Sequence, residues 1–210
     1  MYLFNKKKKT ELKKYFEFYE NEILPKIRSI PEVTQHDYWY HWLLTHTEWV
    51  VFRWIFFAIS IGKNPYPVIF ACAWHDLARI NDWHDAMHWR NAVPIVSKLM
   101  NMFDNLLTEK EKEQVKDAIA HHTGWEKAPN YISACLWDAD RCRLAWEWTF
   151  HERFFNTKIW KKTASHSAKD FLKFQNKCLW RNENTDKENL IQISCWRDTP
   201  DWIYDMMTDN

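Results

Sequence analysis

The residues best suited to chemistry in this sequence are His75 and Asp76, which follow one another at the end of an apolar run. The run covers residues 69–74 and reads IFACAW, so its segment is expected in the protein core. Burying a carboxylate and an imidazole together is costly unless a partner compensates for their lost hydration, and a bound metal ion is the usual partner. The pair therefore predicts a metal site.

Other histidines and aspartates have a spacing that lets several helices each direct one group to the same place. The candidates share helical faces with apolar residues, which predicts that they point inward. The predicted metal ligands are His46, His75, Asp76, His88, His122 and Asp138. A single histidine on an apolar face is more often a core residue with one hydrogen bond. Four helices that each direct such a group inward favour metal binding, because so many unpaired buried polar groups would be destabilising.

This set of imidazoles and carboxylates suits Mn, Fe, Co, Ni or Zn better than an all-oxygen calcium site. The phase of the helix around residue 120 separates two adjacent histidines. His122 continues a stripe formed by Val115, Ala118 and Ile119, whereas His121 lies about 100° away. We therefore expect His122, and not His121, to face the site.

Composition limits the class of protein. The chain has 210 residues, which is one domain or one domain with an appendage, and its formal net charge of +1 gives no support for a nucleic-acid partner. Two glycines cannot supply a Gly-rich phosphate loop or many hairpins, which argues against P-loop, Rossmann and all-β folds. Five cysteines without a C-x-x-C pair indicate reduced thiols, so we expect a cytoplasmic protein.

Nearly the whole chain has helical signals, so we expect an all-α protein. Predicted helices cover residues 10–28, perturbed by Pro25, and residues 38–61, ending at Gly62 and the breaker at 64–67. The next covers residues 68–80 and carries His75 and Asp76. Further helices start at a cap on Asp85, at a capping box of Thr108 and Glu111 that opens a helix to residues 122–124, and after Pro129.

We expect three regions: a basic tail and helix in residues 1–35, a core in 36–145, and a helical extension in 146–210 that packs on the core. The lysine run at residues 6–9 precedes no long apolar segment, so it is not a signal peptide. The most hydrophobic stretch, residues 49–61, is too short to span a bilayer, and no membrane partner is expected.

The candidate residues resemble the signature of the HD-domain superfamily of metal-dependent phosphohydrolases, which is H…HD…D on an all-α core. The signature falls here on His46, His75-Asp76 and Asp138. A closer likeness is to a bacterial branch with the run H-D-S-x-R-x-N-D-x-x-D-x-x-H, which reads HDLARINDWHDAMH at residues 75–88. The same branch has an H-T, matched by residues 122–123, and a W-D-A-D-R, matched by residues 137–141.

The resemblance covers residues 36 to 145 approximately. The chain departs from it at Leu77, Trp89 and Arg143, where serine, glycine and an acidic residue are common.

The resemblance implies an HD-domain-like helical bundle around a metal site. His46, His75, Asp76 and Asp138 would hold one divalent transition-metal ion, and His88 and His122 would help to hold a second, as in dinuclear members. It further implies that a metal-activated water attacks a phosphate ester, with Asp76 bridging metals or orienting that water.

Three other residues are candidates for substrate binding. Arg79 follows His75 by one turn and suits a bidentate phosphate clamp, or else forms a surface salt bridge with Asp82 or Asp85.

Arg141 would contact a phosphate or pair with Asp140. Trp83, like Trp89 and Trp137, lies near predicted ligands and stacks on a base or packs in the core.

The expected substrate is a nucleotide or another small phosphate ester. Two alternatives remain. One is a dinuclear iron oxygenase, for which Tyr38 or Tyr40 would be the residue to inspect, and the other is a domain that binds a nucleotide without turnover. The sequence leaves the oligomeric state open.

Overall fold

The computed structural model describes residues 6–31, 47, 50–51, 54–55, 58–59, 62–79, 85, 87–123, 127–141 and 155–157. Within these residues the secondary structure is helical and contains no strand, which confirms the all-α prediction for this part of the chain. The main helices are α1 (Lys6–Phe18), α2 (Leu24–Arg28), α6 (Pro65–Trp74), α7 (His88–Met100), α8 (Glu109–Ala120) and α9 (Tyr131–Arg141). None of the helices in the described part is long and apolar enough to cross a membrane.

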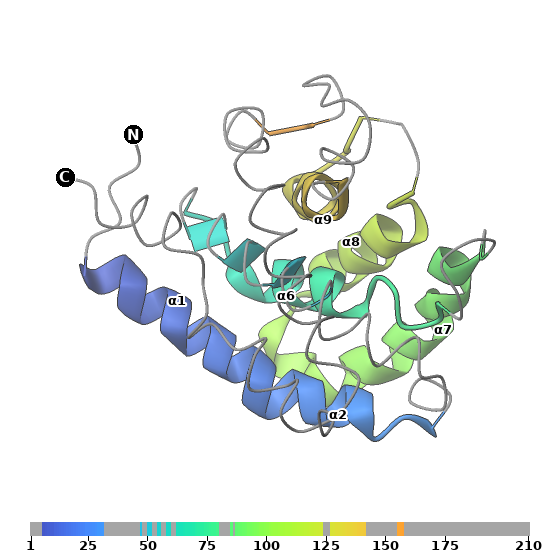
Figure 1. The fold of residues 1–210 in the computed structure, drawn as a ribbon, viewed down its shortest axis with the longest axis horizontal. Helices are drawn as coiled ribbons and strands as arrows, with labels where there is room; N and C mark the ends of the chain where they lie inside the picture. The colour runs from blue at the N-terminus through green and yellow to red at the C-terminus, as the bar shows by residue number, and fades with distance from the viewer. Residues whose placement is uncertain are drawn as a thin grey trace, which may run out of the picture.

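The first predicted helix is a helical segment interrupted by a π turn. α1 is followed by the π-helical η1 (Tyr19–Ile23), and α2 then carries Pro25 near its start. Proline has no N–H to donate to the carbonyl four residues earlier, so the chain changes its hydrogen-bond spacing just before it. Figure 1 shows this segment, α1 to α2, along one edge of the molecule.

The predicted stop at Gly62 is confirmed. Gly62 has a φ of +67°, a left-handed conformation that glycine adopts without a Cβ penalty. Its N–H donates to the carbonyl of Ile59, and the N–H of Lys63 donates to the carbonyl of Ala58. These two bonds form a Schellman motif, which ends the preceding helical turn.

The boundaries predicted for the helix before His75 were wrong. α6 begins at Pro65 and ends at Trp74, and Asn64 caps it by accepting a hydrogen bond from the N–H of Tyr66. Prolines are tolerated in a first helical turn because its N–H groups have no intrahelical acceptor, so Pro65 and Pro67 start this helix instead of breaking the chain. His75 is the C-cap, and Asp76 lies in the turn that follows.

Two other cap predictions had opposite outcomes. The capping box of Thr108 and Glu111 is present at the start of α8, with both reciprocal hydrogen bonds formed. The predicted cap on Asp85 was wrong, because Met87 is the N-cap of α7 and makes no side-chain cap bond. Asp85 instead contributes its main-chain carbonyl, as described below.

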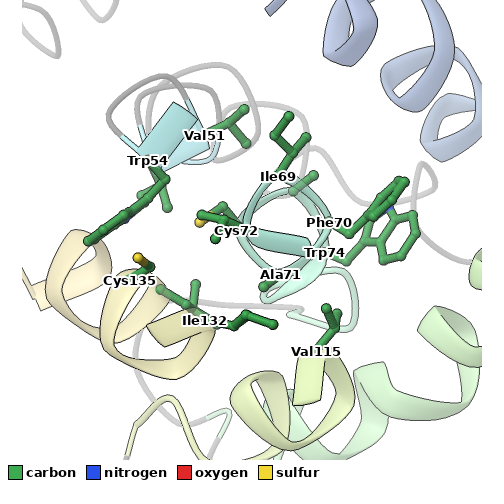
Figure 2. Packing of buried hydrophobic residues seen from close by; sticks show 14 of the residues in the cluster. Val51, Trp54, Ile69, Phe70, Ala71, Cys72, Trp74, Val115, Ile132 and Cys135 are labelled. Carbon is green, nitrogen blue, oxygen red and sulfur yellow. The ribbon is translucent and has the colours of Figure 1, made fainter. Parts of the chain in front are cut away.

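α6 lies at the centre of the described core. It packs against α8 and α9, and α7 packs against α8 (Figure 1). Its composition explains this position, because every residue of α6 except Tyr66 is buried. Figure 2 shows Cys72 of α6 facing Cys135 of α9, while Phe70 and Trp74 fill the opposite side of α6. The boundaries predicted at residues 35/36 and 145/146 remain predictions.

Candidate metal centre

Three chain segments bring polar side chains together where helices begin or end. His75 caps the C-terminus of α6 and Asp76 follows it, His88 is the first residue of α7, and His122 follows the C-cap of α8. Because α8 packs against both α6 and α7, these three helix ends meet. All four side chains are buried, with at most 5% of each residue exposed.

The imidazoles surround the carboxylate of Asp76. Its Oδ1 lies 3.2 Å from Nε2 of His88 and 3.5 Å from Nε2 of His122. Its Oδ2 lies 3.4 Å from Nε2 of His75. The Nε2 atoms of His88 and His122 are 3.3 Å apart. Asp76 is therefore the centre of a cluster in which each histidine directs the same ring nitrogen inward.

The opposite ring nitrogens fix the tautomers of these histidines. Nδ1 of His75 lies 2.8 Å from the carbonyl oxygen of Cys72, and Nδ1 of His122 lies 2.8 Å from that of Ile119. Nδ1 of His88 bonds the carbonyl of Asp85. A carbonyl only accepts hydrogen bonds, so each Nδ1 carries the proton and donates it.

A neutral ring with its proton on Nδ1 presents a lone pair at Nε2. In this cluster those lone pairs would face carboxylate oxygens and one another in a buried place, which is repulsive. A positive charge between them, from a metal ion or from added protons, removes the repulsion. Metal-binding histidines commonly donate the second ring N–H to a carbonyl, as these three do.

The separations fit a transition-metal ion. Two ligands that each lie about 2.1 Å from one ion are about 3.0–3.4 Å apart at tetrahedral or octahedral angles. The separations between the inward-facing atoms are 3.2–3.5 Å. Ligand atoms of His75, Asp76 and His122 all lie within 4.8 Å of one another, and this trio could hold a metal ion. His88 contacts two members of the trio, Asp76 and His122.

The electrostatics of the cluster draw positive charge to it. Burial would raise the pKa of Asp76, but the charge of His75, the contacts of its carboxylate with Nε2 of His122 and His88, and the charge of Arg79 hold that pKa well below its usual value. Burial would lower the pKa of His88, but its contacts with Asp76 raise it above the ordinary value. Asp76 is thus a buried anion that requires cationic partners.

Arg79 is one of those partners. Its Nη1 donates to Oδ2 of Asp76 at 3.2 Å, and only 10% of its side chain is exposed. Arg79 consequently belongs to the cluster. The alternative partner Asp82 lies outside the described residues.

Asp138 is buried but has partners of a different kind. Its Oδ1 accepts hydrogen bonds from the main-chain N and Nδ2 of Asn156, and its Oδ2 accepts one from the N–H of Thr157. Burial raises the pKa of Asp138 despite these bonds. The described metal-ligand trio does not include Asp138, so its assignment as a ligand remains a prediction.

The other predicted site residues divide into those that the structure describes and those that it does not. Arg141 is buried, and its guanidinium lies 5.6 Å from the ring centroid of Trp137. His121 is exposed and its Nδ1 contacts Asp117 at 3.1 Å, as the helix phase predicted. His46 and Trp83 lie outside the described residues, as do Tyr38 and Tyr40.

Sequence reasoning missed the partners of Asp138, and nothing in the spacing of Asn156 and Thr157 signals them. It also missed the carbonyl partners of the three Nδ1 atoms, which depend on how each helix end turns.

Comparison of the chain with protein-family models, with curated proteins and with solved structures gave no match.

Proposed function

We propose that the protein is a metal-dependent phosphohydrolase of the HD type, acting on a nucleotide or another small phosphate ester. The observation that carries the proposal is the arrangement around Asp76. Three histidines direct Nε2 toward the carboxylate oxygens of Asp76, and main-chain carbonyls accept hydrogen bonds from their Nδ1 atoms. Such an arrangement is typical of a transition-metal site.

His75, Asp76 and His122 would hold a Mn, Fe, Co, Ni or Zn ion, and His88 would complete the site or help to hold a second ion. A divalent ion bound there would activate a water molecule as the nucleophile and polarise a phosphoryl oxygen. The carbonyl bonds to Nδ1 keep the three rings oriented, so the ligand atoms need little rearrangement when the ion enters. HD-type ligation by His46 and Asp138 is part of the proposal.

Arg79 places a planar cation beside this site. A guanidinium can bind two phosphate oxygens at once, and burial strengthens charge-assisted hydrogen bonds. We assign Arg79 to the substrate phosphate. Arg141 is buried beside Trp137, and both of its alternatives, a phosphate contact and pairing with Asp140, remain predictions.

A dinuclear iron oxygenase is the second candidate, and it depends on a second ion, which the position of His88 allows. Two overlapping trios, His75-Asp76-His122 and Asp76-His88-His122, share two ligands, which provides donors for two neighbouring ions. Metal analysis after anaerobic purification separates the candidates. Two irons per chain with oxygen uptake would support the oxygenase, whereas Mn, Co or Ni with phosphate release would support the hydrolase. Metal binding with nucleotide affinity but no turnover would indicate the non-catalytic domain.

The experiment that tests the hydrolase is a phosphate-release screen of nucleotides, cyclic dinucleotides and phosphomonoesters, supplemented with each metal in turn. The matched control is Asp76→Asn, which keeps the shape of the side chain and removes its charge. We expect release by the wild-type protein with at least one metal and none by Asp76→Asn. Equal release by both proteins, or no release with any combination, would contradict the proposal.

A further inference from the structure

The proposed metal site is almost entirely buried, so a substrate must approach it past the residues that cover it. His88 and His122 are 5% and 2% exposed. Their sequence neighbours Trp89 and His121 are more exposed and lie on the outer side of the same two helix ends. The ends of α7 and α8 thus have an inner pair of residues, His88 and His122, and an outer pair, Trp89 and His121.

The outer pair is in contact. The ring centroids of Trp89 and His121 are 6.5 Å apart, and the ring planes are inclined by 34°. His121 is held in place, because its Nδ1 lies 3.0 Å from the carbonyl oxygen and 3.1 Å from a carboxylate oxygen of Asp117. Both partners accept hydrogen bonds, so Nδ1 is the donor and Nε2 points elsewhere.

A cation stabilises Trp89 from its own helix. The guanidinium carbon of Arg90 lies 4.5 Å from the centroid of the Trp89 ring, a cation–π contact. No carboxylate in the described part of the chain pairs with Arg90. The indole is therefore a partly exposed aromatic surface, held beside the site by contacts with two neighbours.

We propose that Trp89 and His121 form a wall of the substrate entrance and select phosphate esters whose leaving group carries a planar aromatic base. This inference rests on the proposed function. Two aromatic rings at the outer edge of the site can stack on a flat base carried by the leaving group. A leaving group that is a simple polyol or sugar gains much less from these rings. Trp89 is then a specificity-determining residue, and Arg90 holds its ring in position.

The test compares a substrate pair that differs in the leaving group, adenosine monophosphate and glycerol phosphate. We expect Trp89→Leu to lower kcat/KM for adenosine monophosphate about 10-fold or more relative to that for glycerol phosphate. Trp89→Phe, the matched control, keeps a ring and should retain most of the preference. His121→Ala should shift the ratio in the same direction if Trp89→Leu fails to fold. Metal content should be unchanged in all three variants.

The outcomes distinguish this inference from the proposed function. If the wild-type protein hydrolyses both esters but neither Trp89→Leu nor His121→Ala changes the ratio of kcat/KM for the two esters from its wild-type value, the wall is wrong and the hydrolase stands. If no ester is hydrolysed, the hydrolase is wrong, and calorimetric binding of adenosine monophosphate tests the wall alone. Binding that is lost in Trp89→Leu and kept in Trp89→Phe supports the wall. Equal binding by the wild-type protein and Trp89→Leu, or no binding by either, overturns it.

Discussion

The Nε2 atoms of His88 and His122 lie 3.3 Å apart in the protein interior, and neither ring is free to offer its other nitrogen instead. Both Nδ1 atoms are bonded to main-chain carbonyls, one at the start of α7 and one at the end of α8. Two lone pairs at this distance repel unless a cation lies near both. Because α7 packs on α8, positive charge is required between the two Nε2 atoms, and a metal ion or added protons would supply it.

A comparison of two adjacent histidines tests the inward phase of α8. His122→Ala removes a buried imidazole from the candidate site, whereas His121→Ala removes an exposed one that pairs with Asp117. We expect His122→Ala to lower the bound-metal stoichiometry or turnover strongly and His121→Ala to leave metal content unchanged. Elemental analysis of the purified variants measures this, and a larger metal loss in His121→Ala would reverse the assignment.

Arg79→Lys separates charge from geometry. Lysine keeps the positive charge beside Asp76 but loses the planar arrangement of N–H donors. We expect metal content to be retained and kcat/KM to fall roughly ten- to a hundredfold, the effect of losing one charge-assisted hydrogen bond. Unchanged kinetics would remove Arg79 from substrate binding.

Metal affinity should depend on pH through His88. The contacts with Asp76 raise the pKa of His88, so the metal-free ring holds its second proton to a higher pH than an ordinary histidine. A metal ion must displace that proton, and its apparent affinity should increase as the pH rises through the folded-state pKa. The stability that the protonated ring gives the metal-free protein is present at lower pH and is lost over the same rise. Metal titrations by calorimetry between about pH 5 and 8 measure the effect, and affinity independent of pH would contradict it.

Asp138→Asn tests the anchoring of residues 155–157. One carboxylate oxygen becomes an NH₂ group, which would face an N–H of Asn156 or Thr157. A buried donor left without an acceptor costs about 1–3 kcal/mol, so we expect a loss of that size in the free energy of unfolding with metal absent. Denaturant titration measures it. Full stability would contradict the anchoring role, and loss of bound metal in the same variant would support the proposed ligation by Asp138.

The sequence predicted the helical class and the inward direction of His122 because both depend on local periodicity. It also predicted the Gly62 stop and the capping box of α8, which depend on residues within one turn. It placed His75 and Asp76 inside a helix, whereas His75 is the C-cap of α6 and Asp76 lies in the turn that follows. The bonds from residues 156 and 157 to Asp138 span 18 and 19 positions and arise only from tertiary packing.

The central claim is that the buried cluster around Asp76 binds a transition-metal ion. The most direct measurement is the metal content, per chain, of wild-type protein, Asp76→Asn and the control Asp117→Asn, each purified anaerobically and equilibrated with Mn, Fe, Co, Ni or Zn. Asp117 is an exposed aspartate on α8. Its carboxylate and its main-chain carbonyl contact Nδ1 of the outward-facing His121. We predict one or two ions per chain in the wild-type and control proteins and loss of bound metal in Asp76→Asn. Stoichiometric metal in Asp76→Asn, or none in the wild-type protein with any of the five ions, would contradict the account.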